Sequence, residues 1–442
     1  MQFFTSYLLP LSALLLPVLG RPNGIERRQV PNNAIPPSRD PWYTAPAGFE
    51  LAAPGTILRI RTDPSNITAI VAEASAAYNI LFRTTDTLYR PSWAVTTFLV
   101  PKKPVGRSGN SSSKAALLSY QIPYNTADVD GSPSYLLSTE GAMALFGVPA
   151  PTDDITEALS RGWYVNVPDH EGPLASFLSG PQEGHIVIDS VRAVLSSKAF
   201  HGTPSDTRSA LWGYSGGSFA STFAAEVQAS YASELDFAGM AIGGLVPNVT
   251  EVLGDSQSQA SPVIPAGLLG ITSEYPKARQ FLLGQLKTEG PYNATGFLAT
   301  LHYSAGEAFA TYAGQDMNDY FVRGLQGLVD APELARVFGN NGFQGYHGIP
   351  QMPVFAYKAV HDEATNGIAA SDAVITRYCD VGANILYRRN SIGGHSDEAY
   401  NGRPAALEFL SAVLDGSYAQ RYNTTGCTWV DVSINVTAPA TS

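Results

Sequence analysis

The sequence predicts a fold of the α/β class, a mostly parallel sheet covered by helices, on the basis of three observations. Short runs of β-branched and aromatic residues alternate with longer runs whose apolar residues recur at the helical period. Hydrophobic residues make up 44% of the 442 residues, which is enough for a large core and argues against disorder. One long stretch has a helical pattern only. Strands that alternate with helices are typical of a parallel sheet with both faces covered.

The expected strands are short and are separated by helices or loops. In chain order they span residues 93–100, 115–121, 163–167, 209–213, 237–242, 353–357 and 384–387. The clearest helices span residues 186–197, 218–232 and 405–414. In the first helix, Ile186, Val191 and Val194 recur near the helical period. Each of these helices follows a strand, which supports the parallel arrangement.

The stretch 247–350 interrupts this alternation. It has no convincing buried strand, and its apolar pieces at 263–271, 278–286, 297–303, 317–328 and 332–337 have a helical pattern. Because a loop of this length without structure of its own is rare, we expect a helical cap, or lid, on the core. The predicted domain plan is a lead segment at 21–45, a core in two parts at 46–246 and 351–432 that flank the cap, and a tail at 433–442.

The first residues predict the compartment. Residues 1–20 read as a secretory signal peptide, because the apolar run at 7–19 is too short to span a membrane and a small residue ends it. The segment departs from the usual pattern in lacking a basic start. No later run of 18 unbroken apolar residues occurs, so we expect a secreted, extracellular protein without a stable membrane anchor. Arg27-Arg28 is either a dibasic processing site or an exposed charged pair.

Charge excludes some partners. Lys and Arg number 27 against 38 Asp and Glu, which gives a net charge of −11 and argues against a nucleic-acid or anionic-membrane partner. The charged fraction of 15% is low for a globular chain. Glycans would supply the missing solubility, and six N-x-S/T sequons occur, at Asn66, Asn110, Asn248, Asn293, Asn423 and Asn435.

The chain has two cysteines, Cys379 and Cys427. Two are too few for a disulfide-rich scaffold, an all-cysteine zinc site or an iron–sulfur cluster, and we predict no cofactor and no metal. In an oxidising compartment a disulfide between them is the default, and two free buried thiols are the alternative.

Residues 213–217 match the motif G-x-S-x-G, with Ser215 at its centre. The motif alone is common by chance, but here it follows an expected strand and opens an expected helix. A strand–turn–helix places Ser215 on a sharp turn, and glycines on both sides allow the backbone to bend there. The start of a helix also favours a developing negative charge. The alternative is a turn of small residues that only packs helix on strand.

A serine nucleophile needs a base, and four histidines follow Ser215 in the chain. Three of them are better explained as surface or packing residues, namely His302, His347 and His361. His395 lies between the strand at 384–387 and the helix at 405–414. This loop at the carboxyl end of a strand is where active sites of α/β folds lie, so His395 is the predicted base.

The base in turn needs an acid that orients it. Asp362 follows the strand at 353–357 within a short turn, again at a strand tip, and precedes His395 by one strand–helix–strand step. Three other acids are worse placed, and Asp372 is the fallback among them. Asp380 lies beside Cys379, and Asp397 lies beside the base.

Asp169, His170 and Glu171 form a separate group of polar residues after an expected strand. They could form a metal or acid/base site. A strand-end turn that shapes the wall of a pocket is the preferred interpretation.

The sequence resembles the fungal secretory lipases, the family of yeast lipase A, from about residue 40 to the C-terminal helix. The resemblance is carried by the sequences at 53–58, 119–121, 167–173, 213–217, 361–363 and 393–398, which read APGTIL, SYQ, VPDHEGP, GYSGG, HDE and GGHSDE. It implies an α/β-hydrolase core, a helical cap over the site and a catalytic triad of Ser215, Asp362 and His395. It also implies a disulfide between the two cysteines.

By the same resemblance, the oxyanion hole is formed by the backbone amides of Gly216 and Asn125, the latter standing where the family has Asp. The expected activity is hydrolysis of carboxylic esters, as by a triacylglycerol lipase or carboxylesterase, and the expected partner is an ester or lipid substrate. Transient contact with a lipid interface and a monomeric state are also expected. Two alternatives stay open, a narrow esterase that deacylates a fungal secondary metabolite and a non-catalytic binding protein of the same fold.

Overall fold

The computed structural model describes residues 32–106, 114–139, 149–201, 206–365 and 367–436. The predicted signal peptide, the Arg27-Arg28 pair and the sequon at Asn110 lie outside these residues. The chain from Asn32 onward forms one compact unit.

Ten strands form one sheet in the described part of the chain, in the order β1-β2-β3-β5-β4-β6-β7-β8-β9-β10. The pairs β1-β2, β2-β3 and β3-β5 are antiparallel. All pairs from β5-β4 to β9-β10 are parallel, so the predicted mostly parallel sheet is confirmed. The strands are β1 Ile57–Thr62, β2 Ala74–Thr85, β3 Pro91–Pro101, β4 Ala115–Gln121, β5 Tyr164–Pro168, β6 Thr207–Tyr214, β7 Phe237–Gly243, β8 Val354–Ala359, β9 Ile385–Asn390 and β10 Cys427–Val432.

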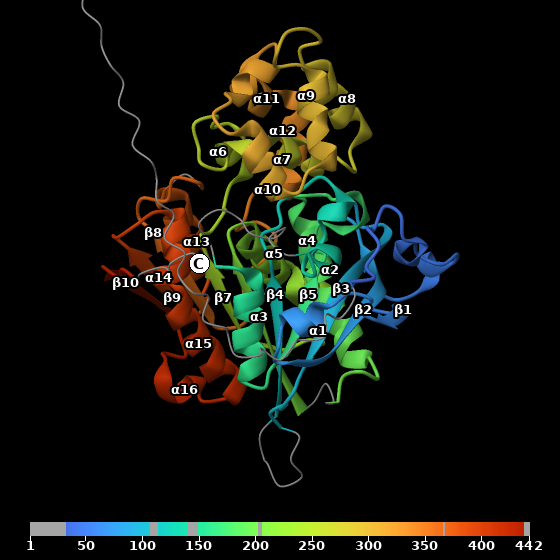
Figure 1. Cartoon of the computed structure of the whole chain (residues 1–442). Coiled ribbons are helices and arrows are strands. Elements are labelled where there is room, and N and C mark those ends of the chain that lie inside the picture. The colour runs from blue at the N-terminus through green and yellow to red at the C-terminus, as the bar shows by residue number, and fades with distance from the viewer. Residues whose placement is uncertain (1–31, 107–113, 140–148, 202–205, 366, 437–442) are drawn as a thin grey trace, which may run out of the picture. The chain divides into compact units, whose positions relative to one another are not determined.

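Helices cover both faces of the sheet (Figure 1). One face packs against α4 (Gly180–Ser196), α5 (Gly216–Tyr231) and α13 (Ala369–Asp380), and the other against α3 (Pro151–Ser160) and α15 (Arg403–Asp415). The shorter helices of the core are α1 Ile67–Ile70, α2 Pro133–Leu136, α14 His395–Asn401 and α16 Tyr418–Arg421. Short 3-10 turns of the core are η1 Pro41–Tyr43, η2 Phe49–Leu51, η3 Val129–Gly131 and η4 Gly172–Leu174.

The chain between β7 and β8 is helical, as its sequence predicts. Its helices lie beyond the carboxyl ends of the parallel strands (Figure 1). They are α6 Val249–Leu253, α7 Ile264–Ile271, α8 Pro276–Gly284, α9 Ala294–Leu298, α10 Ala305–Tyr312, α11 Gly324–Val329 and α12 Pro332–Asn341, with 3-10 turns η6 Ser261–Val263, η7 Ala299–His302 and η8 Met317–Tyr320. One hydrophobic cluster joins them to Phe177, Phe219 and Phe223 of the core. We call this segment the cap; its boundaries as a separate domain remain a prediction.

The two ends of the cap are joined to each other, and the returning end is also bonded to the core. Asn248 and Phe343 form an isolated antiparallel bridge where the cap begins and ends. Glu226 of α5 is buried and accepts hydrogen bonds from the backbone N–H groups of Gly345 (2.7 Å) and His347 (3.0 Å). The helix that begins beside Ser215 therefore also anchors the returning chain.

Cys379 and Cys427 form a disulfide, which confirms the predicted pair. The bond joins the end of α13 to the first residue of β10, the edge strand. It therefore holds the C-terminal strand on the sheet beside β9, the strand that precedes His395.

Removing this disulfide as Cys379→Ala/Cys427→Ala is expected to lower the free energy of unfolding. The cysteines are 48 residues apart, and closing a loop of that length restricts the unfolded chain enough to contribute about 2–4 kcal/mol. Denaturant unfolding measures the change, with the exposed Val381→Ala beside the bond as the control. Equal midpoints for the double variant and the control would contradict the expectation.

Five of the six predicted sequons lie in the described chain. Asn423 and Asn435 are exposed, whereas Asn66 is half-buried. The side chains of Asn248 and Asn293 cap helices α6 and α9, accepting hydrogen bonds from the first turn of each. Glycosylation of these sites remains a prediction.

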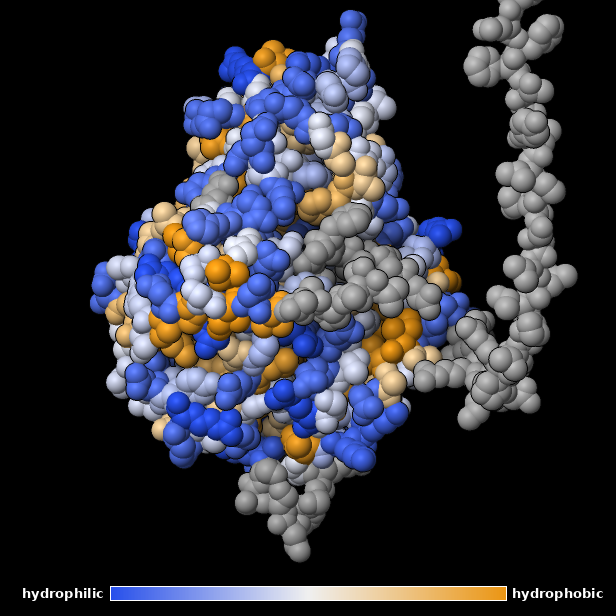
Figure 2. Space-filling model, turned by 60° about the vertical axis from the view of Figure 1, so that its left-hand side comes forward, coloured by the Kyte–Doolittle hydropathy of each residue, from blue (hydrophilic) through white to orange (hydrophobic). Residues whose placement is uncertain are grey.

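The described residues contain no helix that is long and apolar enough to cross a membrane. On the face drawn in Figure 2, hydrophobic side chains lie in separate groups between hydrophilic ones. A mixed surface of this kind is ordinary for a globular protein, in which apolar atoms contribute much of the surface.

Candidate active site

Ser215 lies between β6 and α5, on the sharp turn that its sequence predicts. Its backbone has φ 54° and ψ −123°, a conformation that residues other than glycine rarely adopt. The turn closes tightly, since a Cβ on Gly217 would lie 1.9 Å from the carbonyl oxygen of Gln121, and one on Gly213 would lie 2.1 Å from that of Gly217. Only glycine fits at these two positions, so the motif is required by packing. The strained turn places Ser215 at the tip of the strand.

Ser215, His395 and Asp362 form a chain of hydrogen bonds. His395 Nε2 lies 2.9 Å from Ser215 Oγ, and His395 Nδ1 lies 2.7 Å from Asp362 Oδ2. His395 is 7% exposed and Asp362 3%, while Ser215 is half-buried. The structure thus brings together three residues that lie far apart in the sequence, in the contacts that a nucleophile, a base and an orienting acid require.

Asp362 is held as an anion by its surroundings. Its Oδ1 accepts hydrogen bonds from the backbone N–H groups of Ala364 (3.0 Å) and Thr365 (2.9 Å). Burial would raise the pKa of this carboxyl, but the attraction of His395 and Lys358 and their hydrogen bonds hold the pKa well below its usual range.

Two residues outside the predicted triad fix the backbone of His395. Glu363 Oε2 accepts a hydrogen bond from His395 N at 2.9 Å. The hydroxyl of Tyr214 donates to the carbonyl of His395. Both lie beside triad residues, within the sequences GYSGG and HDE that carry the family resemblance, but the sequence does not indicate these contacts.

The other histidines lie elsewhere. His302 ends η7 in the cap, and His361 is exposed beside Asp362. His347 lies where the cap returns to the core, with its Nδ1 3.4 Å from Glu226.

The other acids have structural partners. Asp372 is in α13 and pairs with Arg389 at 3.2 Å. Asp380 is the last residue of α13, and Asp397 accepts a hydrogen bond from Gly394 N at the start of α14. The ring nitrogens of His395 contact Asp362 and Ser215 and not these three acids.

The two predicted oxyanion donors are neighbours. Gly216 begins α5, and Asn125 Oδ1 lies 2.1 Å from where a Cβ on Gly216 would be. Asn125 has φ 41°, so the loop that carries it is bent there. The carboxyl of Glu171 accepts hydrogen bonds from the N–H of Thr126 at 3.3 and 3.4 Å. It is also close enough to the N–H of Asn125 for that group to influence its pKa.

The side chains of Asp169, His170 and Glu171 make their hydrogen bonds to other residues. Asp169 accepts hydrogen bonds from the N–H (2.9 Å) and hydroxyl (2.5 Å) of Ser134. His170 Nδ1 contacts Glu183 Oε2 at 3.0 Å, and Glu171 faces the loop of Asn125 instead. In the described ranges no cluster of three or more His, Cys, Asp or Glu residues is placed to hold a metal. These contacts agree with a buried turn that supports the pocket wall.

The buried carboxyls predict a protein that is more stable in mild acid. Burial raises the pKa of Asp169, Glu274 and Glu398 to about 7 and that of Asp189 to about 6. Since the folded chain holds these protons more tightly than the unfolded chain, their stabilisation is complete below about pH 4 and is lost as the pH rises towards 7. Burial lowers the pKa of His185 to about 4, which acts in the opposite direction below about pH 6.5.

The four carboxyls outweigh the one histidine, so we expect the free energy of unfolding to fall by on the order of 3 kcal/mol between pH 5 and pH 8. Melting temperatures at the two pH values measure this change. Glu274→Gln replaces one titrating group by a neutral one and should reduce the difference. A higher melting temperature at pH 8 than at pH 5 would contradict the expectation.

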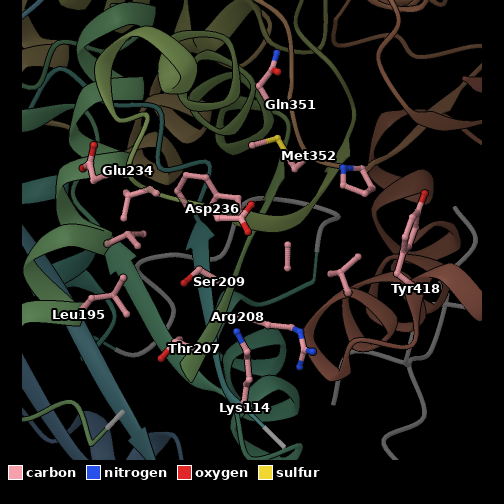
Figure 3. Close-up of a pocket in the computed structure, with 16 residues that line it drawn as sticks. Lys114, Leu195, Thr207, Arg208, Ser209, Glu234, Asp236, Gln351, Met352 and Tyr418 are labelled. Atoms are coloured by element: carbon pink, nitrogen blue, oxygen red, sulfur yellow. The ribbon is translucent and has the colours of Figure 1, made fainter. Parts of the chain in front are cut away.

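A cavity of about 620 Å³ lies at the amino ends of the parallel strands, away from Ser215 and Asp362 (Figure 3). Its lining includes Thr207, Phe237 and Pro353, at or next to the first residues of β6, β7 and β8. Ser215 and Asp362 instead follow the carboxyl ends of strands, the edge where α/β folds bind their substrates. The cavity is therefore separate from the candidate active site.

A serine on a glycine-bounded strand–helix turn, hydrogen-bonded through a histidine to an aspartate under a helical cap, defines a class: this is an α/β-hydrolase with the arrangement of a serine hydrolase. A family model described as "Secretory lipase" matches residues 146–421. The chain belongs to the secretory lipase family.

Relatives with known names support this assignment. The chain is 44% identical to the trichothecene C-3 esterase of Fusarium sporotrichioides, over 91% of this chain and 89% of that protein. It is 34% identical to lipase A of Arthroderma benhamiae, over 86% and 80% of the two chains. The crystal structure of Candida antarctica lipase A superposes with a TM-score of 0.78 at 25% identity, covering 90% of each chain. The predicted α/β-hydrolase fold and the predicted class, carboxylic ester hydrolase, are confirmed.

Proposed function

We propose that the chain cleaves carboxylic esters with Ser215 as the nucleophile, His395 as the general base and Asp362 as the acid that orients it. The observation that carries this proposal is the continuous hydrogen-bonded chain from Ser215 Oγ through both ring nitrogens of His395 to Asp362 Oδ2. Asp362 fixes the ring so that Nε2 faces the serine, and its charge stabilises the imidazolium that forms.

The reaction follows in two steps. His395 takes the proton of Ser215 as Oγ attacks the ester carbonyl, and the N–H of Gly216, with that of Asn125, stabilises the resulting oxyanion by about 3 kcal/mol per donor. The imidazolium then gives its proton to the departing alcohol, which leaves an acyl group on Ser215. A water molecule, deprotonated by His395, hydrolyses this acyl-enzyme and restores the serine.

The cap supplies the apolar surroundings of this chemistry. Its cluster with Phe219 and Phe223 joins the helix of the nucleophile to the cap. An apolar covering of this kind binds acyl chains and screens the intermediate from water.

A fluorophosphonate ester tests the proposal directly, since it reacts with an activated serine and stays attached. We expect one label per chain, found by peptide mass spectrometry on Ser215, with loss of ester hydrolysis in proportion to labelling. Full labelling at another residue, or none with hydrolysis intact, would rule out Ser215 as the nucleophile.

For the substrate, we propose a narrow esterase that acts on an ester of a trichothecene-like secondary metabolite, in preference to a triacylglycerol lipase. The specific support is the 44% identity to a trichothecene C-3 esterase, against 34% to a lipase A. A trichothecene C-3 acetate compared with triglycerides of increasing chain length separates the two. Hydrolysis confined to acetyl esters supports the narrow esterase, and a preference for long-chain triglycerides supports the lipase.

We further propose that the protein acts outside the cell as a monomer, with at most transient contact with a lipid interface. The description of the matching family, "Secretory lipase", supports the extracellular location. Size-exclusion chromatography of protein recovered from culture medium tests both parts.

A further inference from the structure

Lys358 is a buried cation next to the triad. It lies in β8, four residues before Asp362, and is 0% exposed. Lysine is almost never fully buried unless it is paired. Its Nζ donates to the carbonyl of Leu245 (3.0 Å), to Asp362 Oδ2 (3.0 Å) and to the hydroxyl of Thr365 (2.5 Å). Three donors with three partners satisfy an ammonium group completely.

Lys358 and His395 meet at one atom. Asp362 Oδ2 accepts from His395 Nδ1 at 2.7 Å and from Lys358 Nζ at 3.0 Å. With the two backbone bonds to Oδ1, the carboxylate has four donors and no freedom to rotate. The contact with Leu245 also ties this acid to the chain that leaves β7.

The other charged and titratable groups around this centre are mostly acidic or neutral. Glu363 accepts a hydrogen bond from the backbone of His395, and Glu363 and Glu251 both attract the ammonium group of Lys358. The charge of Asp362 also acts on Glu398, Tyr214 and Tyr387, while Arg388 attracts Glu398 and Tyr357 acts on Tyr214. In the described residues Lys358 is the cation that contacts Asp362.

We propose that Lys358 is a positioning residue of the triad: its ammonium group fixes the Asp362 carboxylate and offsets the charge that this carboxylate presents to His395. This inference rests on the proposed function, since it assigns Lys358 a role towards the proposed base.

The physical reason is the balance of charge at the imidazole. A carboxylate alone favours the protonated ring, which cannot take the proton of Ser215. An ammonium bonded to the same oxygen disfavours the protonated ring. Burial lowers the pKa of Lys358, but the attraction of Asp362 opposes that change. Two unit charges within roughly 6 Å at an effective dielectric constant of about 20 interact strongly enough to move a titration by about one pH unit or more.

The test is the pH profile of kcat/KM for a neutral ester, measured by quenched assay from pH 3.5 to 8 with wild type, Lys358→Met, Lys358→Gln and Lys358→Arg. For the two neutral variants we expect the acid limb to move to higher pH by about one unit, a further tenfold loss of kcat/KM on that limb. Lys358→Arg keeps the charge and should restore the limb. Having two neutral variants keeps the test open if one does not fold.

Two controls separate charge from packing. Thr365→Val removes one partner of Lys358 while keeping its charge, so the limb should not move. Lys277→Met removes an exposed lysine of the cap and should leave the profile unchanged. A neutral variant that loses rate equally at every pH, or only melting temperature, would overturn the proposal in favour of a structural role. Failure of fluorophosphonate to label wild-type Ser215 would instead reject the proposed function itself.

Discussion

Ser215→Ala is expected to lower kcat for p-nitrophenyl esters by about six orders of magnitude. Ser215 Oγ is the atom that His395 Nε2 contacts, so its removal leaves a base without a nucleophile. Alanine needs the same φ of 54° as serine, so the turn should fold as before. The measurement is initial rate on purified protein, with unchanged melting temperature as evidence of an intact fold.

The matched control is Ser230→Ala, an exposed serine at the far end of the same helix. It should keep kcat within about twofold, since surface substitutions away from a site have small effects. Equal rates for Ser215→Ala and wild type would end the assignment of Ser215 as nucleophile.

Asp362→Asn is expected to lower kcat by about four orders of magnitude, because an amide stabilises the wrong tautomer of His395. A second effect is specific to this chain. The substitution leaves the buried ammonium of Lys358 without its counter-charge, and such an unpaired buried charge costs about 3–5 kcal/mol. We therefore expect a lower melting temperature together with the lower rate, unlike the effect of Ser215→Ala.

Asp372→Asn provides the control, because Asp372 is the alternative acid that the sequence leaves open. Its partner is Arg389 of β9, so the substitution should leave kcat within about twofold. A loss of rate in Asp372→Asn with none in Asp362→Asn would reassign the acid.

The triad positions could be predicted because each comes shortly after a strand of the parallel sheet, and the ends of those strands are visible in the sequence. The residues that support the triad could not. Lys358 lies within a strand, where a lysine is usually expected to face solvent. Its contact with Asp362 is seen only in the folded structure. Glu171 shows the same limit, since it contacts the loop of Asn125 and the two loops follow different strands, β5 and β4.

The strands expected from the sequence correspond to β3 through β9, so β1, β2 and β10 are strands that the sequence pattern does not predict. β2 contains Asn79 and Arg83 among its apolar residues, which hides the strand pattern. Asn79 is nevertheless fully buried, because Asp63 accepts its amide hydrogen at 2.7 Å. Helix α4 begins at Gly180, six residues before the start that the apolar pattern predicts. The pattern misses these first turns because they carry buried polar residues such as Glu183, which contacts His170. Local pattern fails where buried polar groups find distant partners.

The way the cap is attached has a consequence for how such enzymes can diversify. β7 and β8 are parallel neighbours, so the chain leaves the sheet at the carboxyl end of β7 and must run back to the amino end of β8. The Asn248–Phe343 bridge nevertheless brings the two ends of the insert together before the chain returns to the sheet. Changes of length or sequence inside the insert need not disturb the order of the strands that carry Ser215 and Asp362. Family members can thus acquire new specificities through changes in the cap alone, while the strands that carry the catalytic residues stay the same. The bridge marks the two points at which the cap of a relative could be exchanged for this one.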